Sequence, residues 1–315
     1  MGPECSSSDV AVPDVDVVTR LLRDHAPGLA HLPVRPSPAA GSSNWVFRIG
    51  DDLAVRLPRS DDDVPDLEKE VRWLPRLGPQ LSVPVPEVVE VGRVSPAFPR
   101  PWAVVTWLPG VPPEALPTGG ETVLAESLGE FVRRLHEVPV DDDVPRGPEH
   151  GGYRCGEPVT DVIDRWCEEA ATELADLFDP DGVREAWRRL RDVPAATERA
   201  CWVHTDLSAE NLLVDTQGRL SGVIDFGGVG VGDGSVDLLY AWSMFDAPAR
   251  EVLRRASGVD EATWVRARAW SFVGPGLLSL AHYRDSMPDR AARLTVMVQR
   301  AAAEAGVDLV AASTS

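Results

Sequence analysis

The stretch VHTDLSAENLLVDTQGRLSGVIDFGGVG, residues 203–230, holds several polar side chains of the kind that catalyse reactions: His204, Asp206, Asn211 and Asp225. They flank two apolar runs, NLLVD and LSGVID, which are typical of strands joined by a turn at Thr216–Gly218. The stretch is therefore either a hairpin with ordinary polar ends or a hairpin that presents catalytic groups.

The spacing of these side chains suits phosphoryl transfer. Such a reaction needs a carboxylate near the attacking hydroxyl, ligands for Mg²⁺ and fixed positive charge on the phosphates. The pattern H-x-D-x-x-x-x-N, from His204 to Asn211, places a carboxylate and an amide at the two ends of a short loop. Mg²⁺ prefers such oxygen ligands. Because the hairpin returns the chain, Asp225 is expected beside Asn211, so that a base and two metal ligands converge.

The composition is that of a globular protein. The chain has 315 residues, 43% of them hydrophobic and 26% charged, and its formal net charge is −19. Binding to nucleic acid depends on a basic surface, so this charge argues against a nucleic-acid partner. A chain of this length is expected to form two lobes. Lys69 is the only lysine among the 31 basic residues.

The cysteines and the N-terminus predict a cytoplasmic protein. Four cysteines without metal-ligand spacing are expected to be reduced thiols: Cys5, Cys155, Cys167 and Cys201. Residues 1–16 lack the charged and apolar regions of a secretory signal. No apolar run approaches the ~20 residues of a membrane span, so no membrane partner is expected.

Two regions differ in their hydrophobic pattern. Residues 1–107 are expected to form a small lobe that binds nucleotide. Its predicted elements are a helix at 14–25, a hairpin around a turn at 51–52, a helix over 63–78 and strands in PEVVEVGRV and PWAVVTWL. Residues 108–315 begin with a linker rich in Pro and Gly, to about residue 120, and continue as helices at 124–138, 159–178 and 233–306 around one hairpin. The predicted fold is α+β and bilobal, with an antiparallel sheet in the small N-lobe and a mainly helical C-lobe.

HTDLSAEN followed by IDFG resembles the catalytic loop and the D-F-G motif of kinases. The segments GSSNWVFRIGDDLAVRLPR, EKEVRWLPRLGPQLSVPVPEV and VIDFGGVGVGDGSVDLLYAW resemble, in the same order, the aminoglycoside phosphotransferase family of small-molecule kinases. The resemblance covers residues 40–245 and extends loosely to 305. No A-P-E segment follows IDFG, which argues against a protein kinase. The resemblance therefore implies a protein-kinase-like fold.

The resemblance also implies roles in the catalytic loop: Asp206 as the base, Asn211 and Asp225 as Mg²⁺ ligands, His204 as a structural member and Ser208 as a hydrogen-bond donor to a phosphate oxygen. Asp237 matches the second Asp of the family pattern G-D-P-x-x-D-L, which braces the catalytic loop. Gly234 replaces the Pro of that pattern, so the local turn is expected to differ.

Several residues of the N-lobe correspond to nucleotide-binding positions of the family. The nucleotide phosphates are expected at the GSSN turn, through Ser42, Ser43 and Asn44, and the base near the backbone around Val105 and Trp107. Arg56 stands where kinases carry the V-A-I-K lysine, and Glu70 is its candidate partner on the following helix. Arg is not equivalent to Lys, because its planar group binds two oxygens at once. Glu70 could instead be a solvated helix charge.

The implied reaction moves the γ-phosphate of ATP or GTP to a hydroxyl of a small molecule, with Mg²⁺. The acceptor is expected to be an antibiotic of aminoglycoside, macrolide or nucleoside type, which would confer resistance or self-resistance. Two alternatives stay open: a metabolic kinase acting on a sugar, a choline-like compound or an amino alcohol, and a catalytically dead kinase fold that only binds. Taken alone, each motif is usually a turn, but their joint order favours a kinase. His136, His150 and His282 are expected as ordinary surface or core residues. The sequence predicts no oligomeric state.

Overall fold

The computed structural model describes residues 11–37, 43–113, 121–141, 144, 155–196 and 200–309. These residues divide into two units. The first unit takes its residues from Met1–Gln80, Pro84–Pro109 and Gly222–Gly227, and the second from Leu81–Val83, Gly110–Ser221 and Gly228–Ser315. The segment that contains Asp225 thus belongs to the first unit, although the hairpin before it lies mostly in the second.

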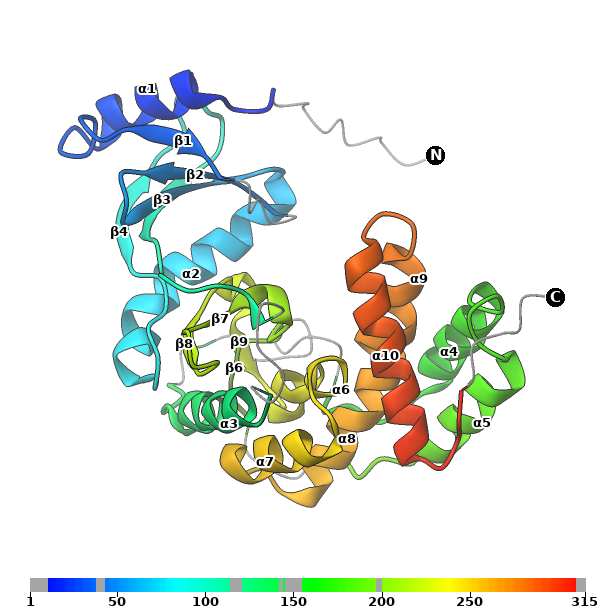
Figure 1. The fold of residues 1–315 in the computed structure, drawn as a ribbon. Coiled ribbons are helices and arrows are strands. Elements are labelled where there is room, and N and C mark those ends of the chain that lie inside the picture. Colours follow the sequence, from blue (N-terminus) through cyan, green and yellow to red (C-terminus); the bar gives the residue numbers. More distant parts are fainter. Residues whose placement is uncertain are drawn as a thin grey trace. The chain divides into compact units, whose positions relative to one another are not determined.

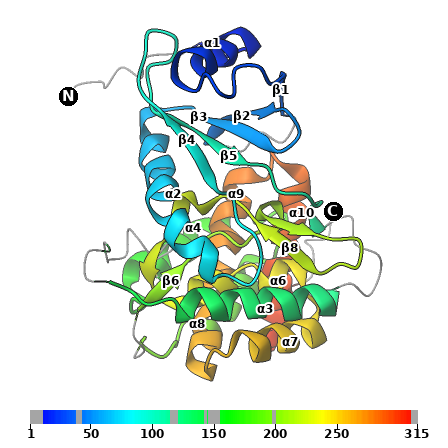
Figure 2. The ribbon, with the colours of Figure 1, turned by 90° about the vertical axis from the view of Figure 1, so that its left-hand side faces the viewer.

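The first unit is an antiparallel sheet with a helix on each face (Figures 1 and 2). Its strands follow the order β1-β2-β3-β5-β4. Their bounds are β1 Val34–Pro36, β2 Asn44–Ile49, β3 Leu53–Pro58, β4 Val88–Gly92 and β5 Trp102–Thr106. Its helices are α1, Val15–His25, which starts at the Asp14 cap, and α2, Val64–Leu77. The expected helices and hairpin of this region are confirmed within one or two residues.

The alternation of side chains along the strands decides which residues face each helix. Phe47, Val55 and Val104 point to the face that α1 covers and join a core with Val18, Leu21 and Leu22 of that helix. Their neighbours along the strands point to the other face, where Ala54, Ala103 and Val105 pack against Leu67 of α2. Arg56 follows Ala54 by two residues and therefore lies on the α2 face of the sheet.

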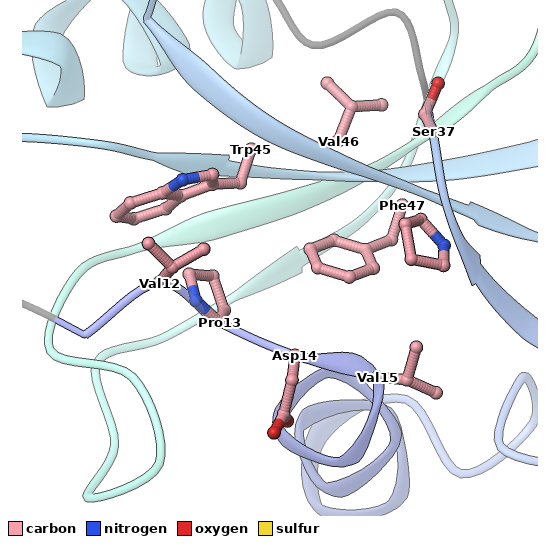
Figure 3. A pocket seen from close by; sticks show the side chains of 9 residues that line it. Val12, Pro13, Asp14, Val15, Ser37, Trp45, Val46 and Phe47 are labelled. Atoms are coloured by element: carbon pink, nitrogen blue, oxygen red, sulfur yellow. The ribbon is translucent and has the colours of Figure 1, made fainter.

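A shallow pocket lies on the α1 face of the sheet (Figure 3). Trp45 and Phe47 point from β2 toward Val12 and Pro13, whereas Val46 points to the opposite side. Val46 is paired with Arg56 across the two strands, so both side chains lie on the α2 face. The pocket therefore opens on the face of β2 that does not carry Arg56.

The second unit is mainly helical (Figures 1 and 2). Its helices are α3 Glu121–Glu137, α4 Asp161–Glu173, α5 Pro180–Leu190, α6 Ala241–Met244, α7 Ala247–Ser257, α8 Glu261–Ser271, α9 Ser279–Tyr283 and α10 Pro288–Glu304, with a π-helical segment at Phe272–Leu278. Two short sheets pair β6 Cys201–Val203 with β9 Gly230–Gly232, and β7 Leu212–Val214 with β8 Leu220–Val223. None of the helices in the described part of the chain combines the length and the hydrophobicity that a membrane crossing requires.

Helices α3 and α7 lie side by side in both ribbon views (Figures 1 and 2). Gly129 of α3 allows this close approach, because a Cβ atom there would lie 2.5 Å from the Cβ of Ala256 and 2.9 Å from the carbonyl oxygen of Leu253. Any larger residue at Gly129 would force the two helices apart. This packing holds the C-terminal end of α3, and with it His136, against the core of the second unit.

The structure differs from the sequence-based expectation in three places. The helix expected over 159–178 ends at Glu173, and α5 then starts at Pro180 with Asp179 as its cap, a cap-and-proline signal that the sequence reading did not use. The second unit holds the sheet of β6 and β9 in addition to the expected hairpin. The sequence did not predict it, because strands of three residues are too short to show an alternating pattern. Strand β1 was not expected, for the same reason.

Candidate active site

In the first unit, Arg56 of β3 forms an ion pair with Glu70 of α2. The Nη1 atom of Arg56 donates to both carboxylate oxygens of Glu70, at 2.6 and 2.5 Å. Glu70 is only 1% exposed, because it follows Leu67 by three residues on the helix face that packs on the sheet. The predicted partnership of the two residues is confirmed, and the alternative of a solvated helix charge is wrong.

Arg56 also reaches the I-D-F-G segment. Its Nη2 atom donates to Oδ1 of Asp225 at 2.9 Å, so one guanidinium joins two carboxylates that are 155 positions apart in the sequence. We call Arg56, Glu70 and Asp225 the Arg56 cluster. Burial lowers the pKa of Arg56, but the charges of Glu70 and Asp225 outweigh burial and raise it above its usual value. The guanidinium is therefore a permanent positive charge in a half-buried position.

Lys69 contributes a second cation to this region. Its Nζ atom lies 2.9 Å from Oδ1 of Asp66 and donates to the carbonyl oxygen of Gly227 at 3.0 Å. The sequence reading assigned Lys69 no role. Its position one residue before Glu70 places it on a neighbouring face of α2, from which it holds the backbone of the segment that follows Asp225.

The other predicted nucleotide-binding residues lie at or near the sheet. Ser42 lies outside the described residues. The backbone carbonyl of Ser43 accepts a hydrogen bond from Arg59 at 3.0 Å, and Asn44 begins β2 as a buried residue. Val105 and Trp107 both pack with Ala54 on the α2 face, and the Arg48 guanidinium covers the Trp107 ring at 4.1 Å. Val105 and Trp107 thus share the face of the sheet that carries Arg56.

In the second unit, the catalytic loop is closed by a hydrogen-bonded pair. A short 3₁₀ turn at Ala209–Asn211 brings Asn211 back toward Asp206. The Nδ2 atom of Asn211 donates to the backbone carbonyl and to Oδ2 of Asp206, both at 2.9 Å. The Oδ1 atom of Asp206 is buried and accepts no hydrogen bond from any residue that the structure describes. A buried carboxylate oxygen without a donor is costly, and an acceptor hydroxyl would supply that donor.

The backbone before Asp206 is held in an unusual conformation. Thr205 has a φ of 78°, and only Asp225, at 65°, shares a positive φ among the non-glycine residues that the structure describes. A β-branched residue rarely adopts this region. The Oδ1 atom of Asp237 accepts the N–H groups of His204 at 2.9 Å and Thr205 at 2.8 Å. The expectation that Asp237 braces the catalytic loop is confirmed.

His136 in turn holds Asp237, the residue that fixes the backbone of the catalytic loop. Its Nε2 atom lies 3.0 Å from Oδ2 of Asp237, whose side chain has no exposed surface. Burial lowers the pKa of His136, but the Cys201 thiol group and the hydrogen bond to Asp237 outweigh it and raise the pKa to about 10. His136 is therefore protonated at neutral pH. The sequence predicts an ordinary surface or core histidine at this position and does not predict its pairing with Asp237. It follows the buried Val132 by four positions, and this spacing could have placed it on the buried face of the helix.

His204 and Ser208 are both buried, at 0% and 2% exposed. The Nδ1 atom of His204 accepts the backbone N–H of Asp206 at 3.3 Å, which agrees with a structural position in the loop. The carbonyl oxygen of Ser208 accepts from the backbone of Asn211 at 3.0 Å. The contact of Ser208 with a phosphate stays a prediction.

The predicted metal ligands have the chemistry that Mg²⁺ prefers. The amide nitrogen of Asn211 is engaged twice by Asp206, which leaves its carbonyl oxygen to act as a ligand. Asp225 presents a carboxylate that is 42% exposed, with one oxygen bonded to Arg56. No group of three or more His, Cys, Asp or Glu side chains suited to a metal occurs within the described ranges. A pair of oxygen ligands completed by phosphates fits Mg²⁺ chemistry better than an all-protein cage.

Comparison with known proteins identifies the family. The family model described as "phosphotransferase enzyme family" matches residues 36–270. The chain is 31% identical over 225 residues to an aminoglycoside 3'-phosphotransferase of Streptomyces fradiae, a match that covers 67% of this chain and 72% of the relative. It is 29% identical over 168 residues to a viomycin phosphotransferase of Streptomyces vinaceus, covering 51% of this chain and 56% of the relative.

Solved structures share the fold. The GDP and kanamycin complex of APH(2")-IIia matches with a TM-score of 0.65 at 20% identity, over 91% of this chain and 98% of that one. A macrolide 2'-phosphotransferase from Brachybacterium faecium matches with a TM-score of 0.60 at 22% identity, over 90% of this chain and 97% of that one. The expected α+β, protein-kinase-like fold is confirmed. Since the family model spans most of the sequence, the chain belongs to the aminoglycoside phosphotransferase family of phosphotransferase enzymes.

Proposed function

We propose that this enzyme transfers the γ-phosphoryl group of ATP or GTP to a hydroxyl of a small-molecule antibiotic and so confers resistance or self-resistance. The buried, unpartnered Oδ1 atom of Asp206 is the observation that carries the proposal. It sits on a loop whose strained backbone is fixed by Asp237. A carboxylate held in this way can orient the attacking hydroxyl and accept its proton late in a loose transition state.

The first unit supplies the positive charge for the phosphates in this proposal. A guanidinium has five N–H donors, and Arg56 uses three hydrogen bonds on Glu70 and Asp225. Its remaining donors can bind phosphate oxygens without breaking either ion pair. Val105 and Trp107 lie on the same sheet face, where an apolar nucleobase surface can pack. Ser42, Ser43 and Asn44 would contact the phosphates from the turn before β2.

The second unit supplies the base and the acceptor side. His204 shapes the loop, Ser208 would donate to a phosphate oxygen, and Asn211 would be a ligand of Mg²⁺. Asp225, which belongs to the first unit, is the other proposed ligand. When bound, Mg²⁺ would neutralise charge on the β- and γ-phosphates. The similar structures include complexes with GDP, ADP and ATP, which supports a nucleotide donor. Because nucleoside triphosphates are made in the cytoplasm, we place the reaction there.

Relatives support an antibiotic as the acceptor. Their names describe phosphotransferases of aminoglycosides, viomycin and macrolides. Phosphorylation of an antibiotic hydroxyl adds charge and bulk, which would weaken binding to the antibiotic target. The experiment is a mass-spectrometric screen of such antibiotics, each incubated with the enzyme, Mg²⁺ and ATP or GTP.

The decisive variant is Asp206→Asn, which keeps the shape of the side chain and removes its charge. Turnover should fall by ~10²–10⁴-fold, the usual contribution of a positioned proton acceptor, while calorimetry shows nearly unchanged binding of the Mg-nucleotide. Asp181→Asn, at a side chain that is 89% exposed on α5, is the matched control and should be fully active. Wild-type turnover in the Asp206→Asn variant would show that this loop is not catalytic.

A further inference from the structure

Lys69, the only lysine among the 31 basic residues of the chain, lies beside the segment that contains Asp225. Its Nζ atom bridges two oxygens, Oδ1 of Asp66 at 2.9 Å and the carbonyl oxygen of Gly227 at 3.0 Å. An ammonium group is compact and carries three donors that rotate freely, whereas a guanidinium is a planar fork. The position between a side chain of α2 and a backbone carbonyl therefore suits a lysine.

Helix α2 holds the same segment by a second contact. Glu70, which follows Lys69 in the helix, accepts a hydrogen bond from the backbone of Phe226. We call Asp225, Phe226 and Gly227 the Asp225 segment, and all three belong to the first unit with α2. Two consecutive residues of the helix thus bind two consecutive residues of the segment, one through its N–H group and the other through its carbonyl group.

The backbone of Gly227 lies directly against α2. A Cβ atom at Gly227 would be 2.9 Å from the Cβ atom of Asp66 and 3.4 Å from its Cγ atom. A larger residue would force the helix and the segment apart. The bond from Lys69 to the Gly227 carbonyl therefore adds to a close packing contact, and the position of the Asp225 segment depends on α2.

The Asp225 segment needs support from outside. Asp225 has a φ of 65°, a conformation that non-glycine residues adopt rarely and that persists only where the surrounding structure holds it. Arg56 donates to the Asp225 carboxylate at 2.9 Å, but a contact with the side chain alone does not fix the backbone on either side. Lys69 fixes that backbone two residues later.

We propose that Lys69 is a positioning residue for the metal site: by holding the Gly227 carbonyl it sets the direction of the Asp225 carboxylate, and so the affinity for Mg²⁺ when nucleotide is bound. The inference rests on the proposed function, in which Asp225 is a ligand of Mg²⁺. Replacing a residue that orients a metal ligand commonly changes the metal affinity by about 10–100-fold. Lys69 contacts neither the metal nor the substrate and acts through Asp225.

A role in helix stability alone predicts a different result. Lys69 and Asp66 form an i, i+3 ion pair whose side chains are 28% and 41% exposed, and such pairs contribute little to stability. Lys69→Met removes this pair and the bond to Gly227 but keeps the apolar stem. Asp66→Asn keeps an amide oxygen beside Lys69, so it weakens only the ion pair. Arg188→Met, which removes another i, i+3 pair, with Glu185 on α5, is the matched control.

Two measurements on the whole chain test the role of Lys69. Calorimetry gives the affinity for ADP with Mg²⁺ and with a chelator, and the ratio of the two affinities is the gain due to the metal. Amide hydrogen exchange of the ligand-free enzyme, followed by mass spectrometry on a peptide that contains Phe226, reports how firmly the segment is held. A peptide from α1 is the internal reference, because global unfolding would accelerate exchange in both peptides.

In Lys69→Met the gain due to Mg²⁺ should fall by about tenfold, while the affinity for ADP in chelator stays unchanged. The peptide with Phe226 should exchange faster, and the α1 peptide should not. Lys69→Arg should restore part of both effects, because it keeps the charge and the donors. Asp66→Asn and Arg188→Met should behave like wild type.

The inference is overturned if either readout is unchanged in Lys69→Met, or if Asp66→Asn reproduces the effects of Lys69→Met. A wild-type enzyme whose affinity for ADP gains nothing from Mg²⁺ would instead count against the proposed function. The exchange rates, which need neither metal nor nucleotide, would then still decide whether Lys69 holds the Asp225 segment.

Discussion

The Arg56 cluster of the first unit and the catalytic loop of the second unit hold buried charge in different ways. In the Arg56 cluster one guanidinium joins two carboxylate side chains. In the catalytic loop the Asp237 carboxylate joins one cation, His136, to two backbone N–H groups. The first arrangement fixes where charge lies and leaves donors for a ligand. The second fixes the path of the backbone, and this is what keeps Thr205 in its strained conformation.

The two regions also share a feature. Each contains one of the two non-glycine residues with positive φ in the described ranges, Asp225 and Thr205. Strained backbone of this kind persists only where the surrounding structure holds it, and it often occurs at functional sites. Substitutions in the Arg56 cluster and substitutions at Asp237 or His136 should therefore have different effects: the first mainly on turnover, the second mainly on the free energy of unfolding.

The largest effect is expected from Asp225, which is predicted to bind Mg²⁺. Asp225→Ala should reduce turnover below ~1% of wild type, since one well-placed charged group at a phosphoryl-transfer site contributes at least ~10²-fold. Asp225→Asn tests the charge alone, because Asn tolerates a positive φ. Steady-state rates with and without a chelator check the metal. Full activity in excess chelator would contradict the metal assignment.

The next effect is on stability, through Asp237. Asp237→Ala leaves two buried backbone donors and a protonated, half-buried His136 without their acceptor, so the free energy of unfolding should fall by about 3–5 kcal/mol. Urea denaturation measures it. Asp260→Ala, which removes the cap of α8, is the control and should cost about 1 kcal/mol. Equal losses in the two variants would show that Asp237 is no more than a local cap.

Arg56 should affect nucleotide use more than stability of the loop. Arg56→Ala should raise the KM for nucleotide several-fold or more, while Arg56→Lys should keep part of the binding, because it keeps the charge but loses the fork. Arg35→Ala, at a 54% exposed residue paired with Asp51, serves as control. Unchanged nucleotide kinetics in Arg56→Ala would remove Arg56 from the phosphate site.

The smallest effect is a pH dependence from His136. Its pKa is raised to about 10 in the folded protein, against ~6.5 when unfolded. The charged form therefore stabilises the fold fully below about pH 6.5, and this stabilisation is lost as pH rises toward 10. Urea denaturation of wild type and His136→Gln between pH 6 and 10 should show the wild-type advantage shrinking with pH. Parallel curves would mean that His136 is not charged. Asp237 and Cys201, the groups that face position 136, are present in both proteins, so the two curves differ only through the imidazole.

Much of the first unit could be predicted from the sequence. Alternation along β2 and β3 fixes which residues share a face, and helical spacing in α2 puts Glu70 beside Leu67. The pairing of Arg56 with Glu70 was implied by the resemblance to the kinase V-A-I-K position, and these local rules explain why the two side chains meet. The spacing from Asp206 to Asn211 likewise closes a short loop by itself. Strand alternation, helical spacing and short loops all depend on residues within a few positions of one another in the sequence, whose relative geometry the backbone sets.

The rest was decided by tertiary packing. His136 meets Asp237 across 101 positions, and Arg293 meets Glu210 across 83. The local pattern of α3 or α10 does not indicate which distant carboxylate each helix will contact. Such a pattern predicts that one face of a helix is buried, but it does not predict which segment covers that face. The sequence by itself determined the short loop from Asp206 to Asn211 and, through the family resemblance, the pairing of Arg56 with Glu70. Only the folded chain decided that a half-buried histidine supports that loop and that Arg293 reaches Glu210 within it, since long-range ion pairs form where helices pack.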